Sequence, residues 1–402
     1  MDRYEEYKDS DVEWIGEIPA GWEVRRISSL YEARNEKVSD RDYPPLSVTM
    51  QGVIPQLETA AKTQDGENRK LVKSGDFAIN SRSDRRGACG ISAYDGSVTL
   101  ITNVLAPKDR ASMNPRYYSY LFRSEGFADE YYRQGTGIVD DLWSTNWARM
   151  KNILVACPSL AEQASIAEHL DAKTTEIDSL VEDCEREVEL LQEYRKAVIS
   201  EAVTKGLDPN APMKDSGIDW IGEIPEGWSL IKAKYVVRVE HGTDPLSEGG
   251  IPVYGSGEKS FKTCGEYKEP PATLVGRKGA TLHIPHYVET RYWNVDTAFN
   301  VNAIKGVYSD KFYYYLAMNF DYKLYLSHTT LPSMTQTAYE NMVLPFPPYA
   351  EQQLIVKSID TKTAEIDSLI ADYQAMADKL REYRKSLISE AVTGKFKVPG
   401  VA

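Results

Sequence analysis

The sequence predicts an α+β protein that is built twice, with two domains of mixed helix and strand and two long helices in an internal repeat. One observation is that Lys8–Trp22 returns as Lys214–Trp228, with 11 of 15 residues identical. Another is that Pro158–Thr204 returns as Pro347–Thr393, with 25 of 47 residues identical. A repeat of this length predicts that each copy folds as one structural unit.

The stretches between the repeated segments, 23–157 and 229–346, share almost no sequence. A duplicated scaffold without a function would let all its parts drift together. Similar repeated segments around dissimilar variable stretches indicate that the variable stretches diverged because they bind different ligands. We therefore divide the chain as follows: 1–157, first repeated segment and first variable domain; 158–205, first long helix; 206–346, linker, second repeated segment and second variable domain; 347–402, second long helix.

Composition excludes several classes of protein. With 402 residues, 42% hydrophobic and 27% charged, the chain can bury a core and is not disordered. No run approaches 18 apolar residues, which argues against a membrane-spanning helix, and the first residues lack a signal-peptide pattern. The four cysteines (Cys89, Cys157, Cys184 and Cys264) form no CxxC pair, which argues against zinc clusters and disulfides and favours a cytoplasmic location.

The net charge of −13 is unevenly spread along the chain. Our count places −5 on 1–22, −7 on 158–205 and −4 on 206–228, whereas the two variable stretches carry +2 and +1. The overall acidity therefore does not exclude binding to DNA by a local basic face.

The two long helices are predicted by heptad spacing and by the absence of Gly and Pro within them. Each spans about 43 residues, roughly 65 Å. Charged residues interrupt the second stripe at Lys173, Glu187, Lys362 and Glu390, so we expect the helices to pair with each other and to leave a seam for partner helices. The candidate seam residues are Leu170, Ile177, Leu180, Leu191, Tyr194, Ile359, Ile366, Leu369, Leu380 and Tyr383.

The variable domains show mixed patterns. Short apolar runs between glycine and proline turns predict strands at 76–80, 98–106, 272–276 and 297–304. Aromatic helices are expected at 114–122 and 309–318, with Asn114 and Ser309 or Asp310 as N-caps. We expect their tyrosines to lie in the core, not to form base-stacking platforms.

At this point the chain resembles the specificity subunits of type I restriction–modification enzymes. The residues that carry the resemblance are the two WIGEIPxGW words at Trp14–Trp22 and Trp220–Trp228, the AEQ helix starts, and the EIDSL and EYRK…SEAV words. The resemblance covers essentially the whole chain. It implies two target recognition domains of mixed α/β structure, separated by two long antiparallel coiled-coil helices in a pseudo-twofold repeat.

The resemblance also implies the function and the partners. Each target recognition domain would recognise one half of a bipartite double-stranded DNA site, while the helices set the spacer and dock two methyltransferase subunits. Restriction subunits would join to translocate and cut. The specificity subunit would have no catalytic role and no cofactor. Two recognition elements at a fixed separation suit half-sites about one helical turn, roughly 34 Å, apart.

Motifs for catalysis or metal binding are weak. FPPY (346–349) is similar to the NPPY loop of amino-methyltransferases, but Phe346 cannot hold an amino group by hydrogen bonding. GSGEKS (255–260) lacks the spacing of a phosphate-binding P-loop. His283 and His286 have no nearby cysteine or carboxylate in sequence, so surface or DNA-facing histidines are favoured over metal ligands.

Two zones are candidates for DNA contact in each variable domain. The first follows a predicted strand in mid-domain, and the second is a polar loop before the long helix. Arginine and lysine bind guanine edges or phosphates, and the sequence leaves base against phosphate open. A solvated basic turn is the alternative. The candidates are Arg82, Arg85, Arg86, Arg277 and Lys278 in the first zone, and Arg133, Thr136, His328, Thr330 and Gln336 in the second.

Trp14, Trp22, Trp220 and Trp228 are expected to be packing anchors and not stacking groups. Two other functions remain open. A stand-alone nuclease or methyltransferase is disfavoured because its motifs are absent. A coiled-coil adaptor that binds only proteins would be separated from a DNA-recognition subunit by a gel shift with the methyltransferase subunit.

Overall fold

The computed structural model describes residues 2–56, 66–82, 87–137, 143–326 and 332–400. Its contacts divide the chain into two compact units. Unit 1 comprises Met1–Cys184 with Ala375–Ala402, and unit 2 comprises Glu185–Gln374. Each unit therefore holds the start of one long helix and the end of the other, as an antiparallel pair requires.

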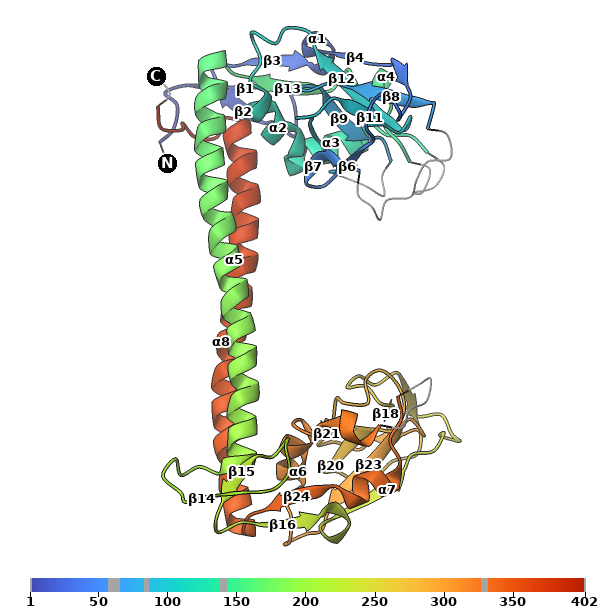
Figure 1. Ribbon diagram of the computed structural model, residues 1–402. Helices are drawn as coiled ribbons and strands as arrows, with labels where there is room; N and C mark the ends of the chain where they lie inside the picture. Colours follow the sequence, from blue (N-terminus) through green and yellow to red (C-terminus); the bar gives the residue numbers. More distant parts are fainter. Residues whose placement is uncertain (1, 57–65, 83–86, 138–142, 327–331, 401–402) are drawn as a thin grey trace. The chain divides into compact units, whose positions relative to one another are not determined.

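Unit 1 contains a variable domain with short strands and helices, followed by the first part of helix α5 (Figure 1). Its elements are β1 (Tyr7–Asp9), β2 (Glu17–Pro19), β3 (Glu23–Arg26), α1 (Ile27–Leu30), β4 (Tyr31–Ala33), β5 (Lys37–Val38), β6 (Leu46–Thr49), β7 (Gly52–Pro55), β8 (Arg69–Val72), β9 (Phe77–Asn80), β10 (Cys89–Ile91), β11 (Gly96–Val98), β12 (Thr102–Pro107), α2 (Pro115–Arg123), α3 (Glu125–Arg133), α4 (Trp147–Met150), β13 (Leu154–Cys157) and α5 (Leu160–Lys205).

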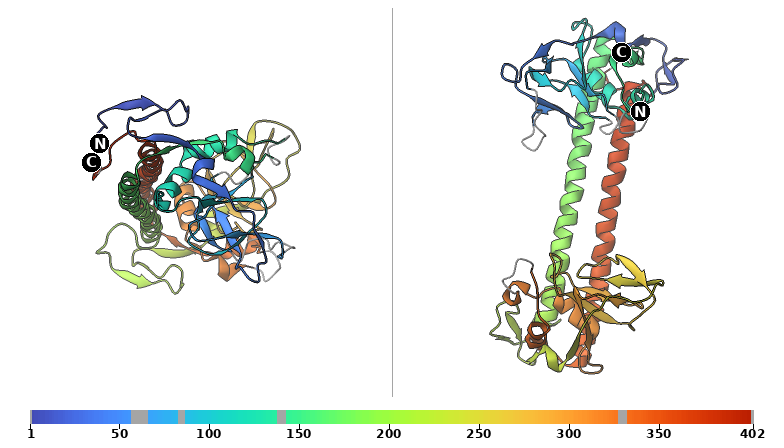
Figure 2. Two further views of the ribbon diagram at one scale, coloured as in Figure 1. Left: turned by 90° about the horizontal axis from the view of Figure 1, so that it is seen from above. Right: turned by 90° about the vertical axis from the view of Figure 1, so that its right-hand side faces the viewer.

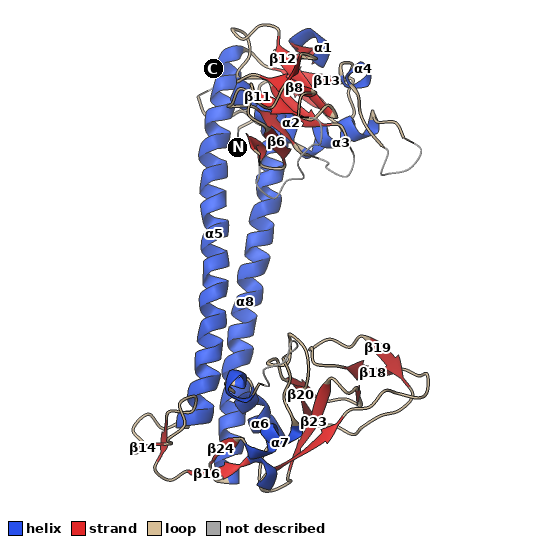
Figure 3. Ribbon diagram, turned by 45° about the vertical axis from the view of Figure 1, so that its right-hand side comes forward, coloured by secondary structure: helices blue, strands red, loops and turns tan. Residues whose placement is uncertain are grey.

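Unit 2 has a similar but not identical order of elements, and strands β20 and β23 of its central sheet lie beside α6 (Figure 3). Its elements are β14 (Met213–Asp215), β15 (Glu223–Pro225), β16 (Ser229–Lys232), the 3₁₀ helix η3 (Ala233–Tyr235), β17 (Val237–His241), β18 (Ile251–Tyr254), β19 (Lys262–Cys264), β20 (Ala272–Gly276), β21 (His286–Val288), β22 (Trp293–Asn294), β23 (Ala298–Ala303), α6 (Asp310–Ala317), the 3₁₀ helix η4 (Tyr322–Tyr325), α7 (Gln336–Asn341), β24 (Val343–Phe346) and α8 (Tyr349–Val392).

The repeat extends into the variable domains, although their sequences do not show it. The central sheet has the order β10-β9-β12-β4 in unit 1 and β21-β20-β23-β17 in unit 2. In each order, strands from the same positions along the two domains pair antiparallel. The repeated segments likewise form matched pairs, β1-β2 with β13-β3 and β14-β15 with β16-β24. The central sheets of the two variable domains therefore share one strand order, whereas the smaller sheets differ, with β6-β7 and β11-β8-β5 in unit 1 and β19-β18-β22 in unit 2.

The predicted strands are confirmed with one correction. The run 98–106 was expected to be one strand, but it holds the end of β11 and most of β12, with a turn at 99–101 between them. The turn contains two apolar residues, Leu100 and Ile101, although they are 41% and 40% exposed. The apolar run in the sequence therefore continues through the turn, and the pattern does not reveal it.

The aromatic helices begin at the predicted caps. The side chain of Asn114 accepts hydrogen bonds from the backbone N–H groups of Arg116 and Tyr117, and Ser309 accepts one from Phe312. Tyr117 and Tyr313 on these helices are 0% and 1% exposed, which confirms that they belong to the core. The capped ends and apolar faces together fix α2 and α6 between the central sheet and the long helices.

The AEQ words hold these helices to the frame. The Gln163 carboxamide oxygen accepts a hydrogen bond from the backbone N–H of Asn114 at 2.8 Å, and its nitrogen donates to the Pro158 carbonyl at 2.9 Å. Gln352 makes the same contacts with Ser309 and Pro347, both at 2.9 Å. A buried glutamine thus joins the start of α5 to the start of α2, and the start of α8 to the start of α6.

The WIGEIP words form hairpins that close over the ends of the long helices. Trp22 and Trp228 are each 2% exposed, and their rings lie beside Gly394 and Gly206, which have positive φ angles and follow α8 and α5. A side chain at Gly394 would clash with Pro19 of the hairpin. These contacts confirm Trp22 and Trp228 as packing anchors.

Both ends of the chain belong to unit 1 and lie together (Figure 2). The backbone N–H of Lys397 donates to the carbonyl of Asp2 at 2.8 Å. The Lys395 ammonium group also donates to the carbonyls of Ile15 and Glu17, at 2.7 and 2.6 Å. The segment after α8 therefore closes on the first hairpin.

Candidate nucleic-acid interface

The two predicted DNA-contact zones meet in unit 1. Arg82, just after β9, forms a β-bridge with Ser144, which also pairs with Thr136. The Thr145 N–H donates to the Ser81 carbonyl at 3.0 Å, and this contact extends the bridge. Residues far apart in sequence thus share one edge of the domain, with Arg82 and Thr136 exposed on it.

Unit 2 repeats the same connection. Lys278, just after β20, forms a β-bridge with Ser333. The Met334 N–H donates to the Arg277 carbonyl at 2.9 Å, and the Gly279 N–H donates to the Pro332 carbonyl at 3.1 Å. The loop after the second strand of the central sheet is therefore fixed to the segment before the long helix in both units.

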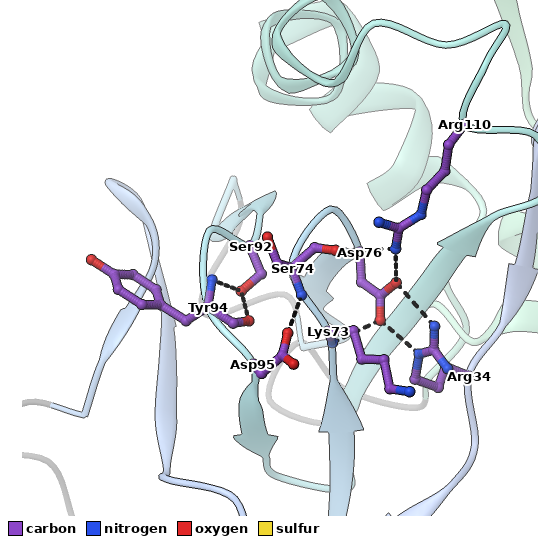
Figure 4. Close-up of polar contacts among 8 residues, drawn as sticks. All are labelled: Arg34, Lys73, Ser74, Asp76, Ser92, Tyr94, Asp95 and Arg110. Atoms are coloured by element: carbon purple, nitrogen blue, oxygen red, sulfur yellow. Dashed lines mark hydrogen bonds and ion pairs between the residues drawn. The ribbon is translucent and has the colours of Figure 1, made fainter.

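The start of strand β9 is fixed by a buried carboxylate (Figure 4). Asp76 is 0% exposed and accepts hydrogen bonds from the Arg34 guanidinium at 2.6 and 3.2 Å and from the Lys73 N–H at 2.9 Å. The Asp76 bond contributes most to holding the pKa of Arg34 above its usual value. This charge-assisted contact fixes the start of β9, and the strand leads to Arg82 at its other end.

In unit 2 one carboxylate lies beside both candidate basic residues. Asp296 is 3.6 Å from Arg277 and 3.7 Å from Lys278, measured between charged atoms. The Arg277 guanidinium also donates to the Asp296 backbone carbonyl at 3.1 Å. The side chains of Arg277 and Lys278 are 28% and 42% exposed. Asp296 thus holds these cations at the edge of the sheet and leaves part of each accessible.

Two other candidates have partners within the chain. Arg133 pairs with Glu13 and Glu130, both at 2.8 Å, and the Glu13 hydrogen bond is the main cause of its raised pKa. The Gln336 amide group donates to the Val239 carbonyl at 3.0 Å and to Glu340 at 2.7 Å, which ties α7 to β17. Arg133 and Gln336 therefore also have structural contacts that the sequence pattern did not indicate.

Four further candidates, Arg85, Arg86, His328 and Thr330, lie outside the described residues. They belong to segments 83–86 and 327–331, which in sequence follow Arg82 and precede Pro332. Their DNA contacts stay a prediction.

Sequence analysis missed the aromatic support beneath the Arg82 edge. The Trp143 ring lies against Gly135, where a side chain would clash, and its N–H donates to the Tyr132 carbonyl at 2.9 Å. Trp143, Tyr132 and Arg82 help to line a cavity of about 20 Å³. The available signal was a glycine and a tryptophan on either side of one polar loop.

The GSGEKS and HIPH segments pack beside the Arg277–Lys278 loop in unit 2. The hydroxyl groups of Ser256 and Thr281 lie 3.0 Å apart, and the Gly279 Cα faces Ser256. His286 packs on the Tyr254 ring at a centroid distance of 4.8 Å, and burial lowers its pKa. In the part of the chain that the structure describes, no group of three His, Cys, Asp or Glu side chains could hold a metal ion.

The two predicted heptad stripes of the long helices are buried to different degrees. Leu170, Ile177, Ile359 and Ile366 are at most 5% exposed, whereas Leu191 and Leu380 are half-buried. Leu180, Tyr194, Leu369 and Tyr383 are 46%, 57%, 48% and 47% exposed. The first stripe enters the core of each unit, so the second stripe turns to solvent. We call these four exposed residues the outer stripe.

Matched ion pairs join the long helices within each unit. In unit 1, the Arg384 guanidinium contacts Asp178 at 2.8 Å, and in unit 2 Arg195 contacts Asp367 at 2.8 Å. In both units the arginine comes from EYRK and the aspartate from EIDSL. These words, which are the most similar between the helices, therefore have a reciprocal packing role.

The comparisons with known proteins agree with this architecture. Residues 225–372 match the family described as type I restriction modification DNA specificity domain. The chain is 23% identical to the putative type I restriction enzyme MjaX specificity subunit of Methanocaldococcus jannaschii, over 96% of both chains. It is also 23% identical to the MjaVIII specificity subunit of that organism, over 95% of this chain and 94% of the relative.

A solved structure supports the fold. A chain from a study of complex assembly and conformational transition of the type I R-M system matches with a TM-score of 0.74. The match has 15% identity and covers 93% of this chain and 98% of the other. With its repeated segments, its paired long helices and the shared strand order of its two central sheets, the chain is similar over nearly its whole length to specificity subunits of type I restriction–modification enzymes. Among the described residues, no helix has the length and apolar character needed to span a membrane.

Proposed function

We propose that each unit recognises one half of a bipartite DNA target through the edge where its two candidate zones meet. The observation that carries this proposal is the bridge between the zones, Arg82 with Ser144 and Lys278 with Ser333. The same backbone connection thus presents different side chains in the two units. A rigid support with variable loops is the arrangement that sequence recognition needs.

The outer stripe is the proposed docking site for methyltransferase subunits. Leu180 and Tyr383 belong to unit 1, while Leu369 and Tyr194 are their repeat equivalents in unit 2. Exposed leucine and tyrosine at heptad positions suit the apolar faces of partner helices. Two equivalent pairs supply one docking position for each of two partners. In this proposal the chain supplies specificity, the partners supply methyl transfer, and restriction subunits add cleavage.

The test replaces Arg277 and Lys278 with alanine in the complex with its methyltransferase subunits. Mapping methylated adenines first defines both wild-type half-sites, and binding is then measured on DNA altered in one half-site at a time. We expect a loss of about 1–3 kcal/mol in discrimination at one half-site only, if a base contact is removed. The matched variant Arg82→Ala should affect the other half-site.

Other outcomes have defined meanings. Equal weakening on every sequence indicates phosphate contact by this loop. Unchanged binding and methylation in both variants would contradict the proposed interface. A complex that assembles with methyltransferase but shows no DNA sequence preference in a gel shift would support the protein adaptor instead.

A further inference from the structure

Unit 1 has an open, polar cavity where helix α2 meets the two long helices. Its volume is about 230 Å³, and three arginines, Arg116, Arg123 and Arg384, help to line it. They come from both ends of α2 and from α8. The cavity does not include the bridge of Arg82 with Ser144, which we call the recognition edge of unit 1.

The cavity carries more positive than negative charge. Arg116 pairs with Asp171, and Arg384 pairs with Asp178 at 2.8 Å. Arg123 donates instead to a neutral group, the Met50 backbone carbonyl, at 2.7 Å. The Tyr120 hydroxyl donates to Asp171 at 2.7 Å, which fixes that carboxylate against the helix. Three guanidinium groups therefore face two carboxylates, and one positive charge is left over.

The equivalent place in unit 2 shows that the frame does not require this charge. Tyr315 and Lys311 contact Asp360 there as Tyr120 and Arg116 contact Asp171. On this alignment of α6 with α2, Tyr314 and Met318 take the positions of Ser119 and Arg123.

The Tyr314 ring in unit 2 lies 5.4 Å from that of Tyr287, between centroids. Unit 2 thus fills with aromatic and apolar groups the position that is polar and cationic in unit 1.

The cavity is connected to the recognition edge of unit 1 through the β6–β7 turn. Met50 lies in this turn, is 62% exposed, and receives the Arg123 hydrogen bond. The Met50 side chain also faces Gly87, at the end of the segment that follows Arg82. Contacts thus run from Arg123 of the cavity through the Met50 turn to Gly87.

We propose that the arginine cavity binds one phosphate group of the DNA backbone next to the half-site recognised by unit 1. This inference rests on the proposed function. Guanidinium groups donate paired hydrogen bonds to phosphate oxygens, and one phosphodiester charge would offset the excess positive charge. Because a phosphate carries no sequence information, the contact fixes the position of the DNA and does not select bases. Unit 2 makes no such contact at the equivalent place.

The test gives unit 1 the side chains of unit 2, with the variant Ser119→Tyr/Arg123→Met. Binding of the methyltransferase complex to its wild-type DNA target is measured from 50 to 200 mM KCl. Losing one phosphate contact lowers the slope of log K against log salt by about 0.9. The ratio of the wild-type to the variant DNA-binding constant should therefore fall by about 3.5-fold from 50 to 200 mM KCl. The methylated DNA sequence should stay the same. Arg25→Met, which removes an exposed arginine of unit 1 that pairs with Glu23, serves as the control.

An unchanged salt slope with intact DNA binding in the double variant would overturn the proposal. Calorimetry with inorganic phosphate alone tests whether the cavity binds free phosphate and not a phosphate of the DNA backbone. Phosphate binding that the double variant abolishes, combined with an unchanged DNA salt slope, would identify a free-phosphate site and also overturn the DNA assignment. If the wild-type complex shows no sequence-specific binding, the proposed function itself fails, which the half-site measurements show independently.

Discussion

The two units share their contacts with the long helices but differ at the edges of their central sheets. Gln163 and Gln352 make the same hydrogen bonds, and Asp171 and Asp360 receive the same tyrosine contact. Around the candidate DNA-contact zones, by contrast, Asp296 lies beside Arg277 in unit 2, whereas Trp143 lines a cavity with Arg82 in unit 1. Duplication thus preserved the groups that attach each domain and let the groups that face outward diverge.

The largest effect of a substitution is expected at the outer stripe, on the binding of methyltransferase subunits. Leu180→Asp should remove the methyltransferase subunit docked on unit 1, and Leu369→Asp should remove the one on unit 2. Burying an unpaired carboxylate in a helix interface costs several kcal/mol. Because both leucines are nearly half exposed, the isolated chain should stay folded. Native mass spectrometry of each complex should show one subunit lost per variant and both lost in the double variant.

A complete complex in both variants would show that these residues do not dock the partners. Glu182→Lys is a suitable control because Glu182 is exposed on α5 and, two residues after Leu180, lies on nearly the opposite side of the helix. Circular dichroism of each free variant separates loss of docking from unfolding.

A smaller effect is expected when the matched core residues of the long helices are shortened. Leu170 and Ile359 are each 0% exposed, and they occupy equivalent positions in α5 and α8. Leu170→Ala and Ile359→Ala should each lower the free energy of unfolding by about 2–5 kcal/mol, through lost burial and an added cavity. Urea denaturation of the two variants measures this. A neutral result for one of them would mean that the frame is not equivalent in the two units.

The long helices and the N-caps of α2 and α6 could be predicted from sequence because local rules determine them. Heptad spacing and glycine ends indicated α5 and α8, and Asn114 and Ser309 carry side chains that suit N-caps. The pattern could not show that the outer stripe is exposed. Whether a heptad position is buried depends on which side of the helix the variable domain covers, and that domain contributes tyrosines from distant parts of the chain.

From the sequence, the candidate zones could be assigned to matching positions in the two domains. The sequence could not predict that the two zones of one domain contact each other. Arg82 and Ser144 are joined by backbone pairing, which no side-chain pattern reports. The pairing of Arg133 with Glu13 was equally hidden, because the two residues are separated by most of the first domain. The shared sheet order also escaped detection, since β-strand topology constrains the alternation of apolar residues but not their identity.

The smallest expected effect concerns the caps of α2 and α6. Asn114 accepts two backbone hydrogen bonds, at 2.9 and 3.3 Å, whereas Ser309 accepts one at 3.4 Å. Asn114→Ala should therefore cost about 1 kcal/mol of unfolding free energy, and Ser309→Ala about half of that. Both losses stay small because Gln163 and Gln352 still hold the backbone N–H groups of these two residues.

The same glutamines allow a sharper form of the cap experiment. In a double-mutant cycle, Asn114→Ala combined with Gln163→Leu should cost more than the sum of the single changes, because each group limits the motion that loss of the other would allow. The corresponding cycle with Ser309 and Gln352 should show weaker coupling, in keeping with its single long hydrogen bond. Strictly additive losses in unit 1, measured by urea denaturation, would mean that the cap and the glutamine act independently. The glutamine would then tether the domain without reinforcing the start of the helix.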